Sequence, residues 1–249
     1  MRDHVLALLR EVAGGGLDAH DALRALSRPD AESLPFATID HHRAIRNGYP
    51  EVIFAEGKTP EQVTAIVSTL LEAGAGSVLV TRASPEVRRA VKMLAPEASE
   101  DERAHAVWIA RGVPEPRGLV VMVSAGTSDG PVLHEARIRS ELLGAEVIVH
   151  EDSGVAGLHR LAPVLPDLER ADCVVVVAGM DAALASVVGG LTAAPVIAVP
   201  TSVGYGSADG GRTALNAMLC SCAAGVAVVG IDDGFGAGTI AARIARGRQ

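Results

Sequence analysis

Two cysteines, Cys220 and Cys222, are the residues whose type and spacing most suggest chemistry, because a cysteine thiolate is both a strong nucleophile and a metal ligand. A C-x-C pair without further Cys or His partners is a poor metal motif, and no two of the eight histidines show H-x-x-x-H spacing. Residues two apart on a helix point about 200° away from each other, so only one thiol can face a given pocket. The pattern alone leaves open whether Cys222 is a nucleophile or a packed thiol. Cys173 begins an apolar run and is interpreted as a small buried hydrophobe.

A second candidate is the loop of residues 124–130, SAGTSDG, which follows an apolar run and precedes a predicted helix. Glycine allows close backbone approach, and hydroxyl and amide groups at a helix amino end suit a phosphate or carboxylate. The loop matches neither a P-loop nor G-x-G-x-x-G, and a well-capped helix start is an equally good interpretation. Its candidate ligand-binding residues are Gly126, Thr127, Ser128 and Asp129.

Three later loops carry weaker signals. Gly179 and Asp181 follow another apolar run, where Asp181 is interpreted most simply as a helix cap. A long Gly-rich loop with Ser202 and Tyr205 is typical of a cover over a ligand, and also of a simple connection. The Gly-rich turn at 231–238 suggests a nucleotide only weakly.

The second half of the chain alternates short apolar runs with helical patterns, which predicts a doubly wound parallel sheet. Ligands of such sheets bind at the carboxyl ends of the strands, so the loops above are expected to meet there. The predicted strands are 119–126, 145–152, 172–179, 194–201 and 225–232, and the predicted helices are 129–143, 154–165, 181–191, 209–221 and one after Gly238.

The first half predicts a smaller α/β domain. Thr59-Pro60-Glu61-Gln62 has the residues of a capping box with proline at the first helical position. Prolines and glycines at 111–118 indicate a boundary, giving domains 1–115 and 116–249. The other predicted elements are helices 3–13, 17–27 and one opening at Ser84, and strands 36–40, 51–55, 77–82 and 104–110.

Composition excludes several classes of protein. Hydrophobic residues make up 49% of the 249 residues, which is typical of a globular chain with a sizeable core. With 2% aromatics, a net charge of -8 and no basic run, binding to nucleic acid is not expected. Long uncharged runs are interrupted by Pro and Gly, so no membrane span is expected. Three cysteines cannot all pair, which favours a reduced, cytoplasmic protein.

The second half resembles the PurE family of aminoimidazole ribonucleotide carboxylases and mutases, whose Gly-Ser-x-Ser-Asp loop is similar to Gly126–Asp129. That resemblance implies a PurE-like sheet. The chain departs from the family where it has Ala178–Ala183 in place of a Gly-Gly-Ala-Ala-His stretch, and where residues 150–161 replace a Ser-Ala-His-Arg segment.

The whole chain is more similar to the LarB family, the pyridinium-3,5-biscarboxylic acid mononucleotide synthases of nickel-pincer cofactor biosynthesis. Ser221-Cys222 fits the Ser-Cys pair of that family, whereas Asp181 and Asp233 stand where Glu and Asn are expected. The matching stretches are residues 40–62, 123–136, 176–191, 195–206 and 221–238.

This second resemblance implies that the substrate is nicotinic acid adenine dinucleotide, carboxylated at pyridine C5 and hydrolysed at its phosphoanhydride. The products would be the biscarboxylic mononucleotide and AMP. The Cys222 thiolate would add to C4, which gives C5 the enamine character needed to attack CO2. Asp181 would either remove the C5 proton or order the groups near it. CO2 or bicarbonate is the expected co-substrate, and Mg²⁺ is expected without assigned ligands. The PurE resemblance implies a homo-oligomer as large as an octamer.

The resemblance also implies the substrate contacts. Residues Gly126–Asp129 would hold the ribose-phosphate end, and Ser202–Gly206, including Tyr205, would close around the ligand. Arg46 and Lys58 would meet the second phosphate or the AMP half, and Gly179 with Met180 would line the ligand. Two other functions remain open: a PurE-type carboxylase or mutase that needs no covalent cysteine, and a non-catalytic dinucleotide-binding module.

Overall fold

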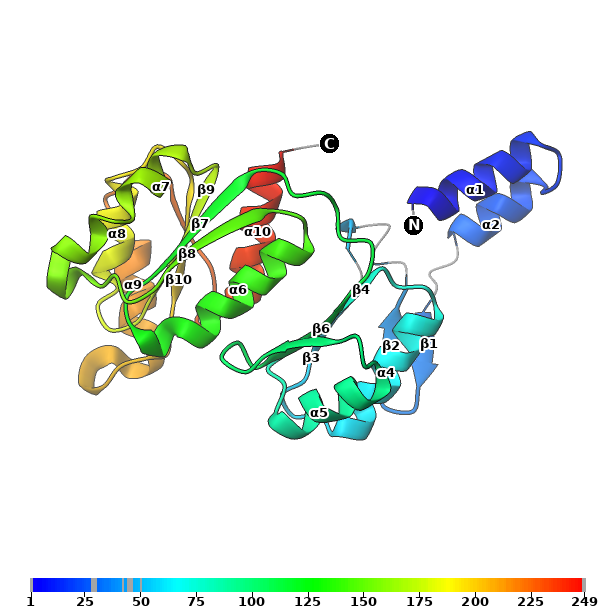
Figure 1. Ribbon diagram of the computed structural model, residues 1–249, viewed down its shortest axis with the longest axis horizontal. Helices are drawn as coiled ribbons and strands as arrows, with labels where there is room; N and C mark the ends of the chain where they lie inside the picture. The colour runs from blue at the N-terminus through cyan, green and yellow to red at the C-terminus, as the bar shows by residue number, and fades with distance from the viewer. Residues whose placement is uncertain (1, 28–30, 42, 44–46, 50, 248–249) are drawn as a thin grey trace. The chain divides into compact units, whose positions relative to one another are not determined.

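A computed structural model describes residues 2–27, 31–41, 43, 47–49 and 51–247 (Figure 1). The chain divides into two compact units. Unit 1 comprises the chain up to Ser99 together with Val107–Arg111, and unit 2 comprises Glu100–Ala106 and the chain from Gly112 onward. Among the described residues, no helix is long and apolar enough to cross a membrane.

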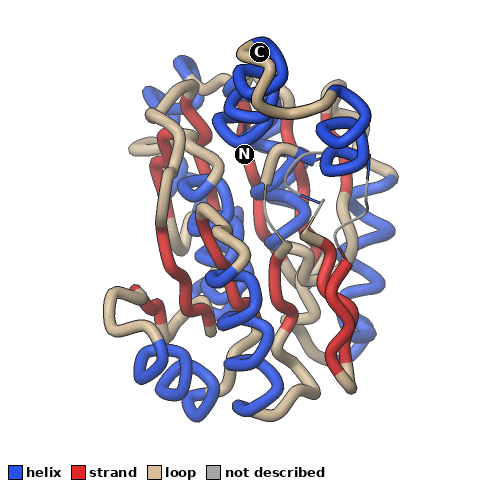
Figure 2. The backbone as a smooth tube through the Cα atoms, turned by 90° about the vertical axis from the view of Figure 1, so that its right-hand side faces the viewer, coloured by secondary structure: helices blue, strands red, loops and turns tan. Residues whose placement is uncertain are grey.

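Unit 2 is built on a parallel five-stranded sheet with the order β11-β10-β9-β7-β8, which confirms the predicted doubly wound α/β class. The alternation of strands and helices can be followed along the tube in Figure 2. The strands are β7 (Leu119–Ser124), β8 (Glu146–His150), β9 (Cys173–Ala178), β10 (Val196–Pro200) and β11 (Val226–Val228). The helices are α6 (Gly130–Leu142), α7 (Leu165–Arg170), α8 (Ala183–Gly189), α9 (Arg212–Leu219) and α10 (Gly234–Arg246), with 3-10 turns η1 (Thr127–Asp129), η2 (Val155–Leu161) and η3 (Gly206–Gly211).

Helices cover both faces of this sheet because its strands carry apolar side chains on both sides. On one face, Met122 and Val175 pack with Leu133 of α6 and Ala241 of α10. On the other face, alternate strand residues pack against η2, α7, α8 and α9. Cys173 is buried in the first of these cores, and burial raises the pKa of its thiol to about 12, as expected of a structural cysteine.

Three predicted helices of unit 2 have different bounds in the structure. Helix 154–165 is replaced by η2 and α7, because Gly157 has a non-helical backbone and Pro163 and Pro166 cannot donate to a continuous helix. Helix 209–221 is the shorter α9, and the last helix begins at Gly234 instead of after Gly238.

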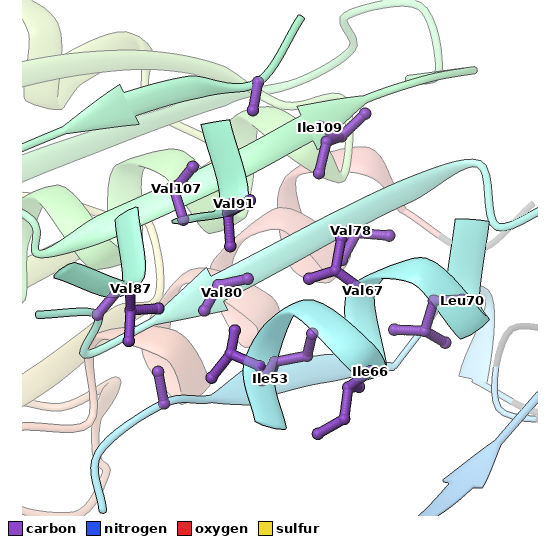
Figure 3. Close-up of a cluster of buried hydrophobic side chains, with 14 of the residues drawn as sticks. Ile53, Ile66, Val67, Leu70, Val78, Val80, Val87, Val91, Val107 and Ile109 are labelled. Atoms are coloured by element: carbon purple, nitrogen blue, oxygen red, sulfur yellow. The ribbon is translucent and has the colours of Figure 1, made fainter. Parts of the chain in front are cut away.

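A second sheet has the order β3-β4-β6-β5, in which β3 and β4 are parallel and β4 and β6 antiparallel. Most of this sheet belongs to unit 1, whereas Glu100 and Asp101 of β5 and Ala106 of β6 belong to unit 2. Figure 3 shows its core, where Ile53 and Val80 meet Val67 of α4 and Val91 of α5. The strands are β3 (Val52–Phe54), β4 (Ser77–Thr81), β5 (Ser99–Asp101) and β6 (Ala106–Ala110), with a separate antiparallel pair β1 (Ala31–Leu34) and β2 (Ala37–Asp40). The helices are α1 (Arg2–Ala13), α2 (Ala19–Ser27), α4 (Pro60–Glu72) and α5 (Pro85–Leu94).

The capping box predicted for α4 is confirmed. The Gln62 backbone amide donates to Thr59 Oγ1 at 3.3 Å, and the Thr59 amide donates to Gln62 Oε1 at 3.0 Å. Strands β1 and β5 were not predicted, because Ala-Glu-Ser-Leu and Ser-Glu-Asp lack the β-branched and aromatic residues that favour strands.

Candidate active site

The carboxyl edge of the unit 2 sheet gathers the loops that the sequence singled out. The Ser153 amide donates to the Ser124 carbonyl at 2.8 Å, joining the loops after β8 and β7. The Met180 amide donates to the Val203 carbonyl at 3.0 Å, joining the loops after β9 and β10. These bonds bring the loops into one surface, as the parallel topology requires.

Asp129 connects three of these loops. Its side chain is only 3% exposed. Thr201 Oγ1 donates to its Oδ1 at 2.7 Å, and the Gly126 amide donates to its Oδ2 at 2.8 Å. Burial raises the pKa of Asp129, while the hydrogen bonds from Thr201, Gly126 and the Gly179 backbone oppose that rise. The carboxylate is therefore directed at protein groups, and we infer that it positions the loops.

Beside it, Thr127 and Ser128 are exposed in the turn that leads into α6. Their hydroxyls lie at the amino end of a 13-residue helix, where the backbone dipoles favour negative charge. This part of the edge is suited to an anionic group such as a phosphate.

The loop after β9 has a strained backbone. Met180 and Ala182 both have φ of 54°, a left-handed conformation that costs a non-glycine residue about 1–2 kcal/mol. At Gly179 a Cβ would lie 2.3 Å from the Val203 carbonyl oxygen and 2.7 Å from Thr201 Oγ1, so only glycine fits. Such strain gathers at functional sites when the surroundings hold it in place.

Asp181 lies in this strained loop with an exposed side chain. The Ala183 amide donates to its Oδ1 at 3.4 Å, which is long for a hydrogen bond. The residue at the N-cap of α8 is Ala182, so Asp181 has only a marginal capping contact. An exposed carboxylate at the carboxyl edge has the placement that a general base needs.

The loop after β10 contains Ser202, Gly204, Tyr205 and Gly206 in an irregular turn. Tyr205 is 81% exposed, and Gly204, at φ 155°, would place a Cβ 2.4 Å from that of Ala208. The Ser202 amide donates to Asp232 Oδ1 at 2.8 Å. An exposed tyrosine on a glycine-rich turn is typical of a loop that covers a ligand.

Left-handed residues are concentrated at this edge. Five of the seven non-glycine residues with positive φ in the described part of the chain belong to its loops: Asp152, Met180, Ala182, Asp209 and Asp232. Sequence inspection missed Asp232 and Thr201, although each is the last residue of a predicted strand, at the edge where ligands of such a sheet bind. It also missed Ser124, whose buried Oγ has no hydrogen-bond partner among the described residues.

Charged contacts hold the loop after β8. Glu151 accepts hydrogen bonds from Arg103 and, at 3.0 Å, from His134. The hydrogen bond from Arg103 lowers the pKa of Glu151. Arg160 donates to the Gly154 carbonyl at 3.1 Å. Because these groups bond one another, they fix the loop and are less suited to reacting with a substrate.

The glycines of the 231–238 turn serve helix packing. A Cβ at Gly234 would lie 2.2 Å from the Val132 carbonyl oxygen, and one at Gly238 would lie 2.4 Å from that of Ala136. Asp233 caps α10 by accepting from the Gly236 amide at 2.7 Å. The weak nucleotide signal of this turn is therefore explained by the close approach of α10 to α6.

Cys222 lies at the opposite, amino edge of the sheet. The loop that contains it runs from the end of α9 to Val226, the first residue of β11. Val226 is the register partner of Val196, which begins β10. Since β10 has five residues, it spans about 16 Å, and Cys222 and Asp181 of one chain are separated by a distance of that order.

The local setting of Cys222 also differs from the prediction. We expected it at the end of a helix, but α9 ends at Leu219 with Cys220 as its C-cap. Ser221 Oγ is 2.8 Å from Ser186 Oγ and accepts from the Ala223 amide at 3.3 Å, so side-chain bonds replace further helical turns. Cys220 and Cys222 are both exposed residues with free thiols.

The two remaining predicted substrate contacts, Arg46 and Lys58, do not lie at this edge of the sheet in the part of the chain that the structure describes. Arg46 lies outside the described residues. Lys58 belongs to unit 1, where its Nζ donates to the Phe54 carbonyl at 2.7 Å. Within the described ranges, no group of three or more His, Cys, Asp or Glu side chains could hold a metal ion, so Mg²⁺ has no identified ligands.

Comparisons with known proteins agree with this two-part organisation. Residues 31–111 match the model of the LarB/PurE-like N-terminal domain, and residues 119–249 match that of AIR carboxylase. The chain is 38% identical over 218 residues to an uncharacterised protein of Methanocaldococcus jannaschii, covering 84% of this chain and 83% of that one. A crystal structure of a variant of the Treponema denticola PurE2 protein gives a TM-score of 0.40 at 20% identity, covering 50% of this chain and 76% of that one.

The two domain matches occur in the order expected of LarB proteins, and the second covers more than half of the chain. They establish that the chain belongs to the LarB family and is a carboxylase-type enzyme with an AIR carboxylase domain.

Proposed function

We propose that this protein carboxylates nicotinic acid adenine dinucleotide at C5 of the pyridine ring and hydrolyses its phosphoanhydride. The products are pyridinium-3,5-biscarboxylic acid mononucleotide and AMP, the former for nickel-pincer cofactor biosynthesis. The observation that carries the proposal is the exposed Cys222 thiol, on the Ser-Cys loop of a LarB-family chain. An exposed thiol is accessible to a ring, whereas Cys173 is buried.

The thiolate reverses the polarity of the ring. Its sulfur forms a bond to C4, and the ring electrons move to give a dihydropyridine whose C5 is nucleophilic. C5 then attacks the carbon of CO2, and the ring nitrogen becomes an iminium. Loss of the C5 proton restores the enamine, and expulsion of the thiolate from C4 restores the aromatic pyridinium. In the second reaction, water attacks the phosphoanhydride, and the bond that breaks releases AMP from the mononucleotide.

Asp181 is the proposed acceptor of the C5 proton, because its carboxylate is exposed in the strained loop after β9. Thr127 and Ser128 at the amino end of α6 are the proposed contacts of the ribose phosphate. Tyr205 is proposed to close over the ligand and exclude water. No step is assigned to a metal, since no ligand set is identified among the described residues.

The proposed site needs two copies of the chain. Cys222 and Asp181 lie at opposite edges of one sheet, too far apart to contact a single pyridine ring. We therefore propose that the Cys222 loop of one copy meets the carboxyl edge of another in a homo-oligomer, where two-fold symmetry makes each contact twice.

The test is mass spectrometry of the small molecules formed from the dinucleotide, ¹³C-bicarbonate and Mg²⁺. The wild-type protein is expected to give a ¹³C-carboxylated mononucleotide and AMP, whereas Cys222→Ala gives neither product and Cys220→Ala, the matched control, gives both. Unchanged dinucleotide with the wild-type protein would reject the proposal in favour of a PurE-type reaction or a binding module. Product from Cys222→Ala would reject the covalent mechanism.

Mixing two inactive variants tests the shared site. Cys222→Ala and Asp181→Asn chains, unfolded and refolded together, should recover about a quarter of the wild-type rate if each site takes one residue from each copy. A mixture that stays inactive while it assembles normally would show that both residues act within one chain.

A further inference from the structure

Cys220 is the member of the C-x-C pair to which the proposed function gives no role. On a continuous helix, residues two apart would point about 200° away from each other, and the two thiols would be kept apart. In the structure α9 ends at Leu219, and Cys220 is its C-cap with φ of -94° and ψ of 7°. Cys222 therefore lies beyond the helix, whose geometry no longer separates the two thiols.

The residue between the two cysteines faces the protein. Ser221 is partly buried, and its Oγ lies 2.8 Å from Ser186 Oγ of α8. The cysteines on either side of it are both exposed residues with free thiols. Chain geometry keeps Cα atoms two residues apart within about 7 Å, and a disulfide needs a separation of about 4.4–6.8 Å. The two thiols thus share the outer side of one short loop and can reach each other.

The loop can adjust its backbone at little cost. In the part of the chain that the structure describes, no hydrogen bond involves Cys222. A Cβ at Gly225, which ends the loop, would meet nothing within 4 Å. A disulfide closed across a single intervening residue is forced away from its preferred geometry, and such strained, exposed bonds are easily reduced. A bond between Cys220 and Cys222 would therefore be reversible.

Cys173 cannot take the place of Cys220. It is buried on β9, and burial raises the pKa of its thiol to about 12. Because the thiolate and not the thiol reacts with oxidants, a buried thiol with a raised pKa is protected. Oxidation is therefore expected at the exposed pair alone.

We propose that Cys222 is a site of reversible oxidation by hydrogen peroxide and that Cys220 is its resolving thiol. The Cys222 thiolate attacks one peroxide oxygen, so that an S–O bond forms, the O–O bond breaks and hydroxide leaves. The Cys220 sulfur then attacks the sulfenic sulfur, so that the S–S bond forms and the S–O bond breaks. The two hydroxides take up the two thiol protons. Both sulfurs are oxidised, and one peroxide molecule is reduced to two water molecules.

The disulfide both inhibits and protects the enzyme. A sulfur held in a disulfide cannot add to a pyridinium ring, a consequence that rests on the proposed function. The access that admits a dinucleotide to Cys222 also admits peroxide, which is far smaller. Without Cys220, the sulfenic acid is oxidised further to sulfinic and sulfonic acids, which thiols do not reduce. The second cysteine thus converts irreversible damage into reversible inhibition.

The experiment is peptide mapping of the full-length protein after peroxide treatment and alkylation in denaturant. Trypsin cleaves after arginine, so Cys220 and Cys222 are released together on peptide 213–243 and Cys173 on peptide 171–212. In the wild-type protein, the first peptide should lose two hydrogen atoms and resist alkylation, whereas the second should be alkylated normally. Dithiothreitol should restore alkylation of the first peptide. A first peptide that stays fully alkylated after peroxide treatment would overturn the proposal.

Cys220→Ser is the matched variant, and its rate of product formation before oxidation should equal that of the wild-type protein. After the same peroxide treatment, its Cys222 should gain two or three oxygen atoms. Dithiothreitol should then restore less than about a tenth of the rate, against more than about half in the wild-type protein. Equal recovery in the two proteins, or a wild-type disulfide that joins two copies of the chain, would overturn the resolving role of Cys220.

The two proposals fail separately, because peptide mapping needs no turnover. A peroxide-dependent disulfide between Cys220 and Cys222 in a protein that leaves the dinucleotide unchanged removes the proposed reaction alone. Dinucleotide turnover in a protein that forms no such disulfide removes the redox pair alone.

Discussion

The two edges of the unit 2 sheet differ in how closely their loops are packed. At the carboxyl edge, Asp129 bonds neighbouring loops, and a Cβ at Gly179 would collide with two groups. At the amino edge, Cys222 is exposed, and a Cβ at Gly225 would meet nothing within 4 Å. The loops of the carboxyl edge are therefore held rigidly together, whereas the amino edge presents Cys222 from an open loop.

Cys222→Ser should have the largest effect on function. Loss of the thiolate is expected to lower the rate of product formation at least about 1,000-fold, because the pyridinium ring then has no nucleophile to activate it. Since the side chain is exposed, the thermal unfolding midpoint should not change. The measurement is product formation by mass spectrometry beside Cys220→Ser, and equal losses in the two variants would contradict a specific role for Cys222.

Substituting alanine at Gly179 and at Gly225 compares the two edges directly. Gly179→Ala should cost about 2–3 kcal/mol of unfolding free energy, because the added Cβ overlaps Val203 and Thr201. Gly225→Ala should cost about 1 kcal/mol, from its φ of 87° alone. Urea unfolding measures both values. Equal costs would mean that the carboxyl edge is no more closely packed than the amino edge.

Asp129→Asn tests the buried carboxyl through its pH dependence. A carboxyl whose pKa is raised on folding stabilises the folded protein below its unfolded pKa, and that contribution is lost as pH rises through the folded pKa. Asparagine cannot ionise, so the stability lost in the variant should be greater near pH 4 than near pH 7. Urea titrations of both proteins at the two pH values provide the check. A pH-independent difference would argue that Asp129 has an ordinary pKa.

Ser221→Ala should have the smallest effect. It removes the 2.8 Å hydrogen bond to Ser186, at a cost of about 1 kcal/mol. Because the neighbouring residue is Cys222, the rate of product formation should also fall several-fold, by an order of magnitude at most. Ser186→Ala, which removes the same bond from α8, should reproduce both effects. A rate loss in only one of these variants would show that the hydrogen bond does not orient the thiol.

Much of the fold could be predicted because it depends on local patterns. The apolar strands of unit 2 and the Thr59 capping box are encoded by neighbouring residues. The helix ends were less predictable, since α9 stops where Ser221 bonds to Ser186, a residue far away in sequence. The candidate site was likewise predictable only in its local features. The sequence indicated which loops meet, but Asp129 is held by a hydrogen bond from Thr201, a partner 72 residues away.

The position of Cys222 could have been predicted from the topology of the sheet, and the residue type alone did not give it. Its residue type suggested a nucleophile, and the order of helix followed by strand places its loop at the amino edge of the sheet. The chemical pattern alone grouped it with loops at the other edge. Likewise, Gly234 and Gly238 looked like a nucleotide signal until α6 was seen to pack against them.

The contact between α6 and α10 also has a consequence while the chain is being synthesised. Arg139 of α6 bonds to Thr239 of α10, 100 residues later in the chain. At about 5–20 residues per second, a ribosome needs roughly 5–20 s to make that intervening segment. During this interval the nascent α6 lacks its partner, and the apolar face built around Leu133 lacks the cover of Ala237 and Ala241. The apolar face of α6 therefore stays uncovered until α10 has been made, and slower translation between the two helices would prolong that exposure.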